Sequence, residues 1–488
     1  MRKYYEKKLF VNDFSVSPST QENAYNMKLH TPSLCYNVKS KNGMLLGGNG
    51  LSHLSLPKSR TNPEEYLRGS SGEISIIKTW RYKYYSNVNG RDEYMLVCFA
   101  SDNKLYFNNM TFQDPSYHLV SNKTFNSVPS AITFKANGDE VIAFSSPDDD
   151  MLVWYTDNNP YTVDGTPHFS SICYHNNRLF AIDASDNSVV KYSALSNPLD
   201  WTSTSGVYSP GSITMNDFKG DLRRLISFDN YVYVFRDYGI SRILSYAQDS
   251  VYACSNIYNT SSKIYADTAV VCGSKIYFLQ EDGLYCFDGY SATRVDLPFS
   301  DLITKNSQSL ANACYHDGCY LLACKMSFPE TLSGEASLQN NALVEYNVSN
   351  KTANITRGVD ITCMTSVKDL LINKVITCVR NSDYVWQVTG DGKINASQSL
   401  PKLWKSSKIN LGNFDKDKIL KKVYLTCPCS ATFSVSTDKM TKSISLTNKS
   451  GFQRLLLNVT GREFVFSISS SDPTFNIGNI ELFFVVER

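Results

Sequence analysis

The sequence has no apolar run that approaches the ~20 residues a helix needs to cross a membrane. Its first residues, MRKYYEKKLFVNDF, are basic but lack the apolar core of a signal peptide, so we expect neither export by that route nor membrane insertion. The sequence also lacks an excess of one charge, because it contains 48 Lys and Arg residues and 46 Asp and Glu residues. This balance predicts no bulk electrostatic attraction to nucleic acid or to a membrane surface.

The fingerprints of common enzyme classes are missing too. We find no GxSxG, HExxH, P-loop or Rossmann pattern. The turns Gln280–Gly283 and Thr389–Gly392 are close to the Asp-box of glycosidase propellers but lack its Trp. We therefore predict no catalytic residues, no cofactor and no enzymatic activity.

Residues that ligate metals are few and poorly spaced. Asp148–Asp150 with Asp157 could hold calcium, but the Gly and the final Glu of an EF-hand are missing, which favours a solvated turn. The 13 cysteines are scattered and include no pair of CxxC knuckles, so we expect buried free thiols of a reducing cytoplasm and no metal site. The two groups that come closest to a metal site are Cys427-Pro428-Cys429 and the trio Cys314, Cys319 and Cys324. The five-residue spacing of the trio sends neighbouring thiols to opposite faces of a strand.

Six histidines are available for acid–base chemistry: His30, His53, His118, His168, His175 and His316. His175 and His316 occupy equivalent turns, CYHNNR and CYHDGC. A catalytic residue need not recur in this way, so the repetition indicates a role in the turns.

What the sequence does contain is a repeated β-meander. Arg223–Leu244 alternates apolar and polar residues around turns at Asp229-Asn230 and Asp237–Gly239, a pattern typical of short antiparallel strands. The aromatic content of 12%, with 31 Tyr and 25 Phe, also favours strands over helices. Further copies lie at Tyr94–Phe107, Ala131–Tyr155, Ser171–Tyr192, Ala269–Phe287, Ala311–Tyr346 and Cys363–Val388.

The spacing of these seven copies predicts a β-propeller. Their first central-strand residues follow one another at roughly 40 to 50 residues, the period of four-stranded blades. These residues are Met95, Val141, Leu179, Val232, Ile276, Tyr320 and Leu371. We predict an all-β fold with a propeller of six to eight blades over residues 61–400. One or two large β-sandwiches, in which hairpins also recur, are the alternative.

Both ends of the chain differ from the repeat. Residues 1–60 are rich in Ser, Asn and Gly, and we predict an extended arm that packs on another surface, with one short strand at Met44–Leu46. Residues 401–488 keep the alternation but lose the meander, which predicts a compact β-sandwich. Leu400-Pro401 provides a rigid turn between the two domains.

Several segments resemble, in order, the tail nozzle or hub proteins of short-tailed phages, including the packaged-DNA stabilisation type. His175–Trp201 contains the Asn-Arg-Leu-Phe strand and the later Asn-Pro-x-x-Trp that are common in that family. The other similar segments are Asn37–Gly50 in the arm, Gly211–Phe235 in the propeller, and Leu403–Val423 and Val459–Phe464 in the sandwich.

This resemblance implies a structural protein of the virion tail that is assembled in the host cytoplasm. Copies would form a homo-oligomeric ring, expected to be a hexamer, next to the portal, the adaptor and other tail proteins. DNA would leave through the lumen without sequence-specific binding. Loops would make the ring contacts, and the N-terminal arm would clasp a neighbour or the adaptor.

Two other functions stay open. A receptor- or glycan-binding propeller would place exposed aromatics around a pocket, although core packing is the favoured role for Trp154, Trp201 and Trp386. A glycan-degrading propeller would need a pair of carboxylates near the central axis.

Two short groups of basic residues, Arg2–Lys8 and Lys416–Lys422, could contact nucleic-acid phosphates. Solvated strand ends are the favoured interpretation of both groups.

Overall fold

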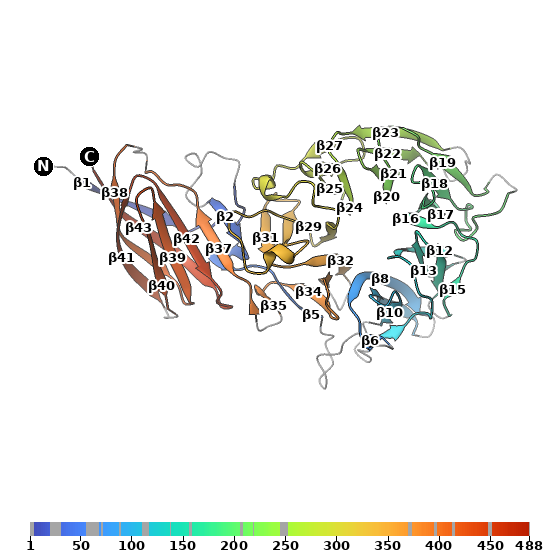
Figure 1. The fold of residues 1–488 in the computed structure, drawn as a ribbon, viewed down its shortest axis with the longest axis horizontal. Helices are drawn as coiled ribbons and strands as arrows, with labels where there is room; N and C mark the ends of the chain where they lie inside the picture. Colours follow the sequence, from blue (N-terminus) through green and yellow to red (C-terminus); the bar gives the residue numbers. More distant parts are fainter. Residues whose placement is uncertain are drawn as a thin grey trace.

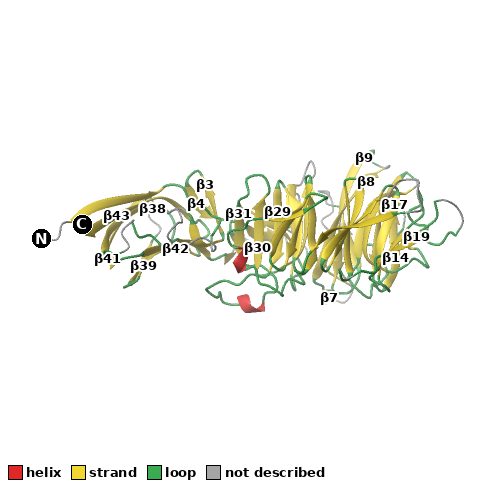
Figure 2. Cartoon of the chain, turned by 90° about the horizontal axis from the view of Figure 1, so that it is seen from above, coloured by secondary structure: helices red, strands yellow, loops and turns green. Residues whose placement is uncertain are grey.

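The computed structural model describes most of the chain. The described residues are 4–19, 31–54, 68–69, 72–86, 89–109, 117–136, 138–155, 159–204, 208–217, 219–244, 252–368, 373–394, 398–411, 415–447 and 451–487. The chain forms a ring of β-sheets with a β-sandwich attached to one side (Figure 1). Seen at 90° to this view, the two domains lie next to each other along the long axis (Figure 2).

The ring is a propeller of seven blades; six are antiparallel sheets, and the seventh adds one parallel pair, between β5 and β35. Blade 1 contains β8 (Ile76–Ser86), β9 (Arg91–Ala100), β10 (Leu105–Asn108) and β11 (His118–Leu119). Blade 2 contains β12 (Ser130–Ala136), β13 (Asp139–Ser146), β14 (Asp149–Tyr155) and β15 (Tyr161–Thr162). Blade 3 contains β16 (Phe169–His175), β17 (Arg178–Asp183), β18 (Val189–Tyr192) and β19 (Gly211–Thr214).

The next three blades repeat this order. Blade 4 contains β20 (Leu222–Phe228), β21 (Tyr231–Arg236), β22 (Gly239–Leu244) and β23 (Ala253–Asn259). Blade 5 contains β24 (Ile264–Cys272), β25 (Lys275–Gln280), β26 (Gly283–Phe287) and β27 (Ala292–Arg294). Blade 6 contains β28 (Asn312–His316), β29 (Cys319–Cys324), β30 (Ala342–Asn347) and β31 (Ala353–Arg357).

Blade 7 takes its fourth strand from the other end of the chain. Its own strands are β32 (Ile361–Lys368), β33 (Asn373–Val379) and β34 (Val385–Thr389). The N-terminal strand β5 (Gly50–His53) pairs antiparallel with β34, placing Leu51 opposite Val388. Two short strands, β35 (Lys393–Ile394) and β36 (Gln398–Ser399), complete the sheet. The last blade therefore contains residues that precede the first blade, which closes the ring.

The core of the propeller is divided among the spaces between blades. Seven clusters of buried apolar side chains each join one blade to the next, including one between blades 7 and 1. The second strand of a blade is covered on both faces, which is why β17 is buried from end to end. Tight turns with positive φ, such as Asn176-Asn177 and Asp229, connect these strands.

The sandwich has two sheets and takes strands from both ends of the chain. One sheet contains β3 (Val38–Lys41), β4 (Met44–Gly47), β43 (Asn476–Glu487), β38 (Lys418–Thr426) and β41 (Phe452–Gly461), with β1 (Tyr4–Val11) also paired to β43. The other contains β2 (Pro32–Tyr36), β37 (Lys402–Ser406), β42 (Phe464–Ser470), β39 (Ala431–Thr437) and β40 (Thr441–Leu446). The remaining elements are the hairpin β6 (Arg68–Gly69) and β7 (Gly72–Glu73) and two 3₁₀ turns, η1 (Ser300–Leu302) and η2 (Glu335–Ser337).

These observations confirm the all-β propeller, and seven blades lie within the predicted range. Six of the seven predicted central-strand residues lie in the second strand of a blade, and Leu371 falls outside the described residues. Residues 1–60 differ from the expected arm, because they provide four strands of the sandwich and the closing strand of blade 7. In the part of the chain that the structure describes, no helix has the length and apolar character to span a bilayer.

Candidate functional site

The innermost strand of each blade borders the centre of the propeller, which we call the channel (Figure 1). Each of these strands pairs with its own blade along one edge only, so the other edge faces the channel. The channel contains a cavity of about 1330 Å³. Its lining comes from all seven inner strands, β8, β12, β16, β20, β24, β28 and β32.

Polar side chains join neighbouring inner strands at the channel. His175 at the end of β16 is hydrogen-bonded through Nδ1 to Ser227 Oγ of the next blade, at 2.9 Å. His316 at the end of β28 makes the same bond to Ser366 Oγ, also at 2.9 Å. The two histidines that share a turn pattern in the sequence therefore share a role as links between blades. Burial lowers the pKa of both imidazoles.

The charged side chains at the channel are mostly cations. Lys78, Arg81, Arg223, Arg224 and Arg380 line it, whereas Asp267 is the one carboxylate among the described lining residues. Arg224 Nη1 donates to the backbone oxygen of Asp267 at 2.8 Å and thereby joins blade 4 to blade 5.

A thiol also lines the cavity beside these cations. Cys363 lies directly opposite Cys378 in the β32–β33 ladder. A hydrogen bond from Cys378 lowers the pKa of Cys363, and the positive charge of Lys78 acts in the same direction.

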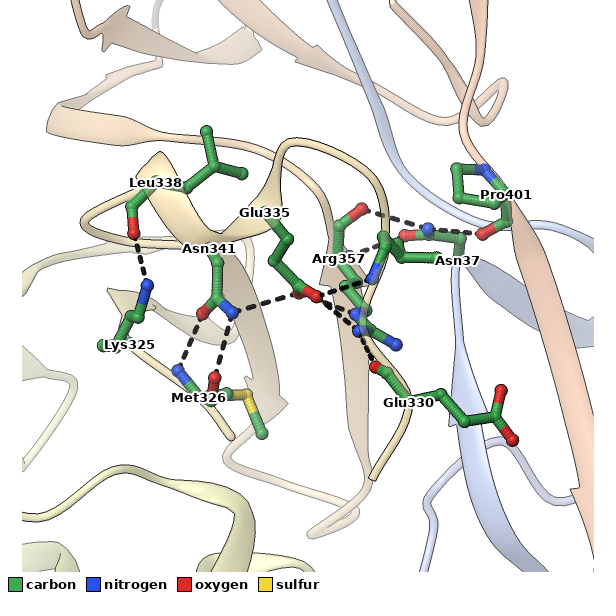
Figure 3. Close-up of polar contacts among 10 residues, drawn as sticks. Asn37, Lys325, Met326, Glu330, Glu335, Leu338, Asn341, Arg357 and Pro401 are labelled. Atoms are coloured by element: carbon green, nitrogen blue, oxygen red, sulfur yellow. Dashed lines mark hydrogen bonds and ion pairs between the residues drawn. The ribbon is translucent and has the colours of Figure 1, made fainter. Parts of the chain in front are cut away.

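A second polar centre lies where the propeller meets the sandwich (Figure 3). Asn37, between β2 and β3, has a positive φ of 58° and is fully buried. Its Nδ2 donates to the backbone oxygens of Arg357 at 3.0 Å and Pro401 at 2.7 Å, and its Oδ1 accepts from Arg357 N at 2.7 Å. One side chain thus joins the N-terminal strands, blade 6 and the interdomain turn.

Below Asn37, a buried ion pair anchors the loop between β29 and β30. Arg357 is fully buried and donates from Nε to Glu335 Oε1 at 2.7 Å. The ring of Phe328 lies 4.0 Å from the guanidinium and the ring of Tyr36 lies 4.8 Å from it. Burial would raise the pKa of Glu335, but the hydrogen bonds and charge of Arg357 outweigh burial and lower it.

Of the acidic residues considered for calcium, Asp148 lies in an exposed turn, as expected, and Asp149 has a structural role. Asp149 is buried and accepts hydrogen bonds from Asn126 N and Nδ2, both at 2.8 Å, so it does not lie in a solvated turn. Asp157 lies outside the described residues. Across the described segments, no group of three or more His, Cys, Asp or Glu could hold a metal ion.

The cysteines of the structure are free thiols, and most are buried, as predicted. Cys427 and Cys429 lie in the sandwich core with their sulfurs 3.7 Å apart. Cys314 and Cys324 belong to clusters on opposite sides of blade 6. They lie in different strands, β28 and β29, so the alternation expected within one strand does not apply to this pair.

The aromatic and basic groups singled out in the sequence are distributed over the molecule. Trp154 and Trp386 belong to the cores between blades, and Trp201 packs on Phe169 with ring centroids 4.7 Å apart. Lys418 is fully buried, which a solvated strand end does not explain, and donates to Arg462 O at 2.9 Å. Of the other histidines, His53 stacks on Tyr384, His118 is exposed, His168 contacts Asp150, and His30 lies outside the described residues.

The sequence matches no protein-family model, and no curated protein shows significant similarity to it. Among solved structures, a catalytically inactive virginiamycin B lyase from Staphylococcus aureus, solved with quinupristin, is 9% identical with a TM-score of 0.42, over 70% of this chain and 99% of that chain. Hsv2 of Kluyveromyces lactis is 8% identical with a TM-score of 0.33, over 58% of this chain and 98% of that chain. The propeller assignment accordingly rests on the strand pairing described above.

Proposed function

We propose that this chain is a structural subunit of a phage tail that forms the nozzle or hub ring below the portal and adaptor proteins. The ring retains the packaged genome and then conducts it, and its lumen lies between subunits, separate from the channel inside each propeller. The order of the sequence segments that resemble this family supports the proposal, as does the combination of a propeller with a sandwich.

The observation that carries the proposal is an exposed apolar face on the sandwich. Phe10 on β1 and Phe452 and Leu456 on β41 are 57%, 64% and 63% exposed. Tyr424 on β38 lies between them, with its ring centroid 5.1 Å from that of Phe452 and 5.0 Å from that of Phe483. Clustered exposed apolar side chains of this kind mark protein–protein contacts. We call these five residues the sandwich face.

Cations border the sandwich face and suit it to a protein partner. Lys8 lies 4.8 Å and Lys422 lies 4.9 Å from the centroid of the Phe483 ring. Aromatic residues are enriched at the core of interfaces between proteins, and the rim of such interfaces is polar. Strand β1 is paired to β43 within its own chain, so in the proposed ring we expect it to contribute a sheet surface.

The lining of the channel gives no support to a glycan-degrading enzyme. Such an enzyme needs two carboxylates at the bond it cleaves. The described lining offers Asp267 alone.

The test is the native mass of the purified protein, alone and mixed with tail particles that lack it, followed by imaging. We expect a closed ring that docks at the tail tip. The double variant Phe452→Lys, Leu456→Glu should stay monomeric, while Tyr290→Lys, which alters a 71% exposed aromatic residue on blade 5, should form rings. A wild-type monomer that binds cell-surface glycan would replace the proposal with a receptor-binding function.

A further inference from the structure

The propeller channel concentrates positive charge in a chain whose charges are otherwise balanced. The whole sequence has 48 basic and 46 acidic residues. The channel lining has five cations and one carboxylate. A cleft lined by one sign of charge focuses the electrostatic field and attracts counter-ions.

Two of the five cations are neutralised by carboxylates nearby. Arg223 is paired with Asp237 at 2.9 Å, and Arg380 is paired with Asp360 at 3.0 Å. Lys78, Arg81 and Arg224 form no ion pair with any described carboxylate. The Nε of Arg81 is buried and has no hydrogen-bond partner among the described residues.

These cations come from opposite sides of the ring but act on one another. Lys78 belongs to β8 of blade 1, and Arg224 belongs to β20 of blade 4. Burial lowers the pKa of Lys78; the thiol of Cys363 and then Asp267 oppose this decrease, whereas the charge of Arg224 adds to it. Lys78 and Arg224 therefore repel each other across the channel, and a bound anion would relieve this repulsion.

Neutral hydroxyl groups share the channel lining with the three cations that lack an ion pair. Hydroxyl groups line the channel at or next to the inner strands of six blades, at Thr79, Ser130, Ser170, Ser227, Ser309 and Thr362. The guanidinium of Arg224 uses Nη1 for its contacts with Ala266 O and Asp267 O, which leaves Nε and Nη2 for a ligand. Guanidinium, ammonium and hydroxyl groups together are the donors that hold phosphate oxygens.

We propose that the propeller channel binds a small anion that carries several phosphate groups, held by Lys78 and Arg224 from opposite sides with Arg81 nearby. The cavity of about 1330 Å³ is larger than the ~300–1,000 Å³ of typical small-molecule sites, so such an anion can enter with part of its hydration shell. This inference is independent of the proposed ring, because it concerns the interior of one subunit.

The test is isothermal titration calorimetry of the full chain with sodium tripolyphosphate at low ionic strength. We expect one site per chain, with affinity that falls as NaCl is added. Arg224→Gln and Lys78→Met should each weaken binding about tenfold or more, because each removes a charge-assisted contact. Arg224→Lys should retain part of the affinity, since it keeps the charge but loses the guanidinium fork.

The matched control is Arg242→Gln. Arg242 lies in the same blade as Arg224, stacks on Tyr231 at 4.4 Å and is absent from the channel lining. It should leave the affinity unchanged within twofold, and circular dichroism will identify any variant that fails to fold. Absence of binding by the wild type, or equal weakening by Arg242→Gln and Arg224→Gln, would overturn the site. Tight binding of citrate without binding of tripolyphosphate would overturn the assignment to phosphate.

Discussion

At the scale of single residues, the fold depends on polar side chains that join segments far apart in the sequence. Asn37 is the clearest case, because its side-chain amide forms hydrogen bonds with backbone groups more than 300 residues away in the sequence. Asn37→Ala should lower the free energy of unfolding by about 3 kcal/mol, since buried backbone groups lose their partners. Urea denaturation measures this change. The control Asn42→Ala shares the positive φ, 53°, at an exposed turn and should cost only about 1 kcal/mol. Equal losses would show that backbone strain alone is responsible.

The two histidine links make stability depend on pH. Burial holds the folded-state pKa of His175 and His316 below the usual 6.5, so the unfolded chain binds protons at a pH where the folded chain does not. Stability is therefore expected to fall as the pH drops below about 6.5. The double variant His175→Gln, His316→Gln should be less stable than the wild type at pH 7.5 but lose less on transfer to pH 5.5, as measured by thermal unfolding. His118→Gln, at an exposed site, should keep the wild-type pH dependence.

At the scale of elements, the closing strand β5 is the one on which the ring depends. Leu51 in β5 is 3% exposed and lies in the core between blades 6 and 7. Leu51→Asp would bury an unpaired carboxylate there and should cost about 3–5 kcal/mol of unfolding free energy, or prevent folding. Leu119→Asp, on the exposed edge strand β11, should change stability by less than about 1 kcal/mol in the same urea titration. Similar values for the two variants would mean that β5 is not needed for closure.

The same elements show what the sequence could predict. The meanders were predictable because apolar strands recur along the sequence and, in blades 1 to 6, the first two strands are joined at turns that need Asn, Asp or Gly. Strands β11 and β15, with two residues each, carry no such pattern. Strand β5 has four residues, and its partner β34 lies more than 300 residues further on, so no local signal reports the pairing. The first sixty residues resemble an arm for the same reason, since their strands are completed only by the C-terminal sheets.

At the scale of the whole molecule, the channel illustrates what sequence patterns cannot convey. The similar turns of His175 and His316 predicted a shared role, but the partner serines belong to the following blades. A net charge of +2 does not reveal the cationic lining, because Lys78 and Arg224 face the same channel only when the ring closes. The sandwich face is likewise assembled from β1, β38, β41 and β43, strands taken from both ends of the chain.

The junction decides whether the two domains behave as one body. The core between blades 5 and 6 extends into the sandwich through Leu34, Tyr36 and Leu403, and the Arg357–Glu335 pair lies beside it. Glu335→Gln leaves the buried guanidinium without its counter-charge and should cost about 3–5 kcal/mol. We expect calorimetry to show one unfolding transition for the wild type and two for this variant, because the propeller and the sandwich lose their coupling.

Glu330→Gln is the control. The Glu330 side chain is exposed, and its carboxylate lies 3.7 Å from the partly exposed Lys405. Glu330 contacts Arg357 only through its backbone oxygen, which the substitution keeps. That change should cost less than about 1 kcal/mol and keep the single transition. Two transitions in the wild type would show that the domains unfold independently and that the ion pair stabilises only the loop of blade 6.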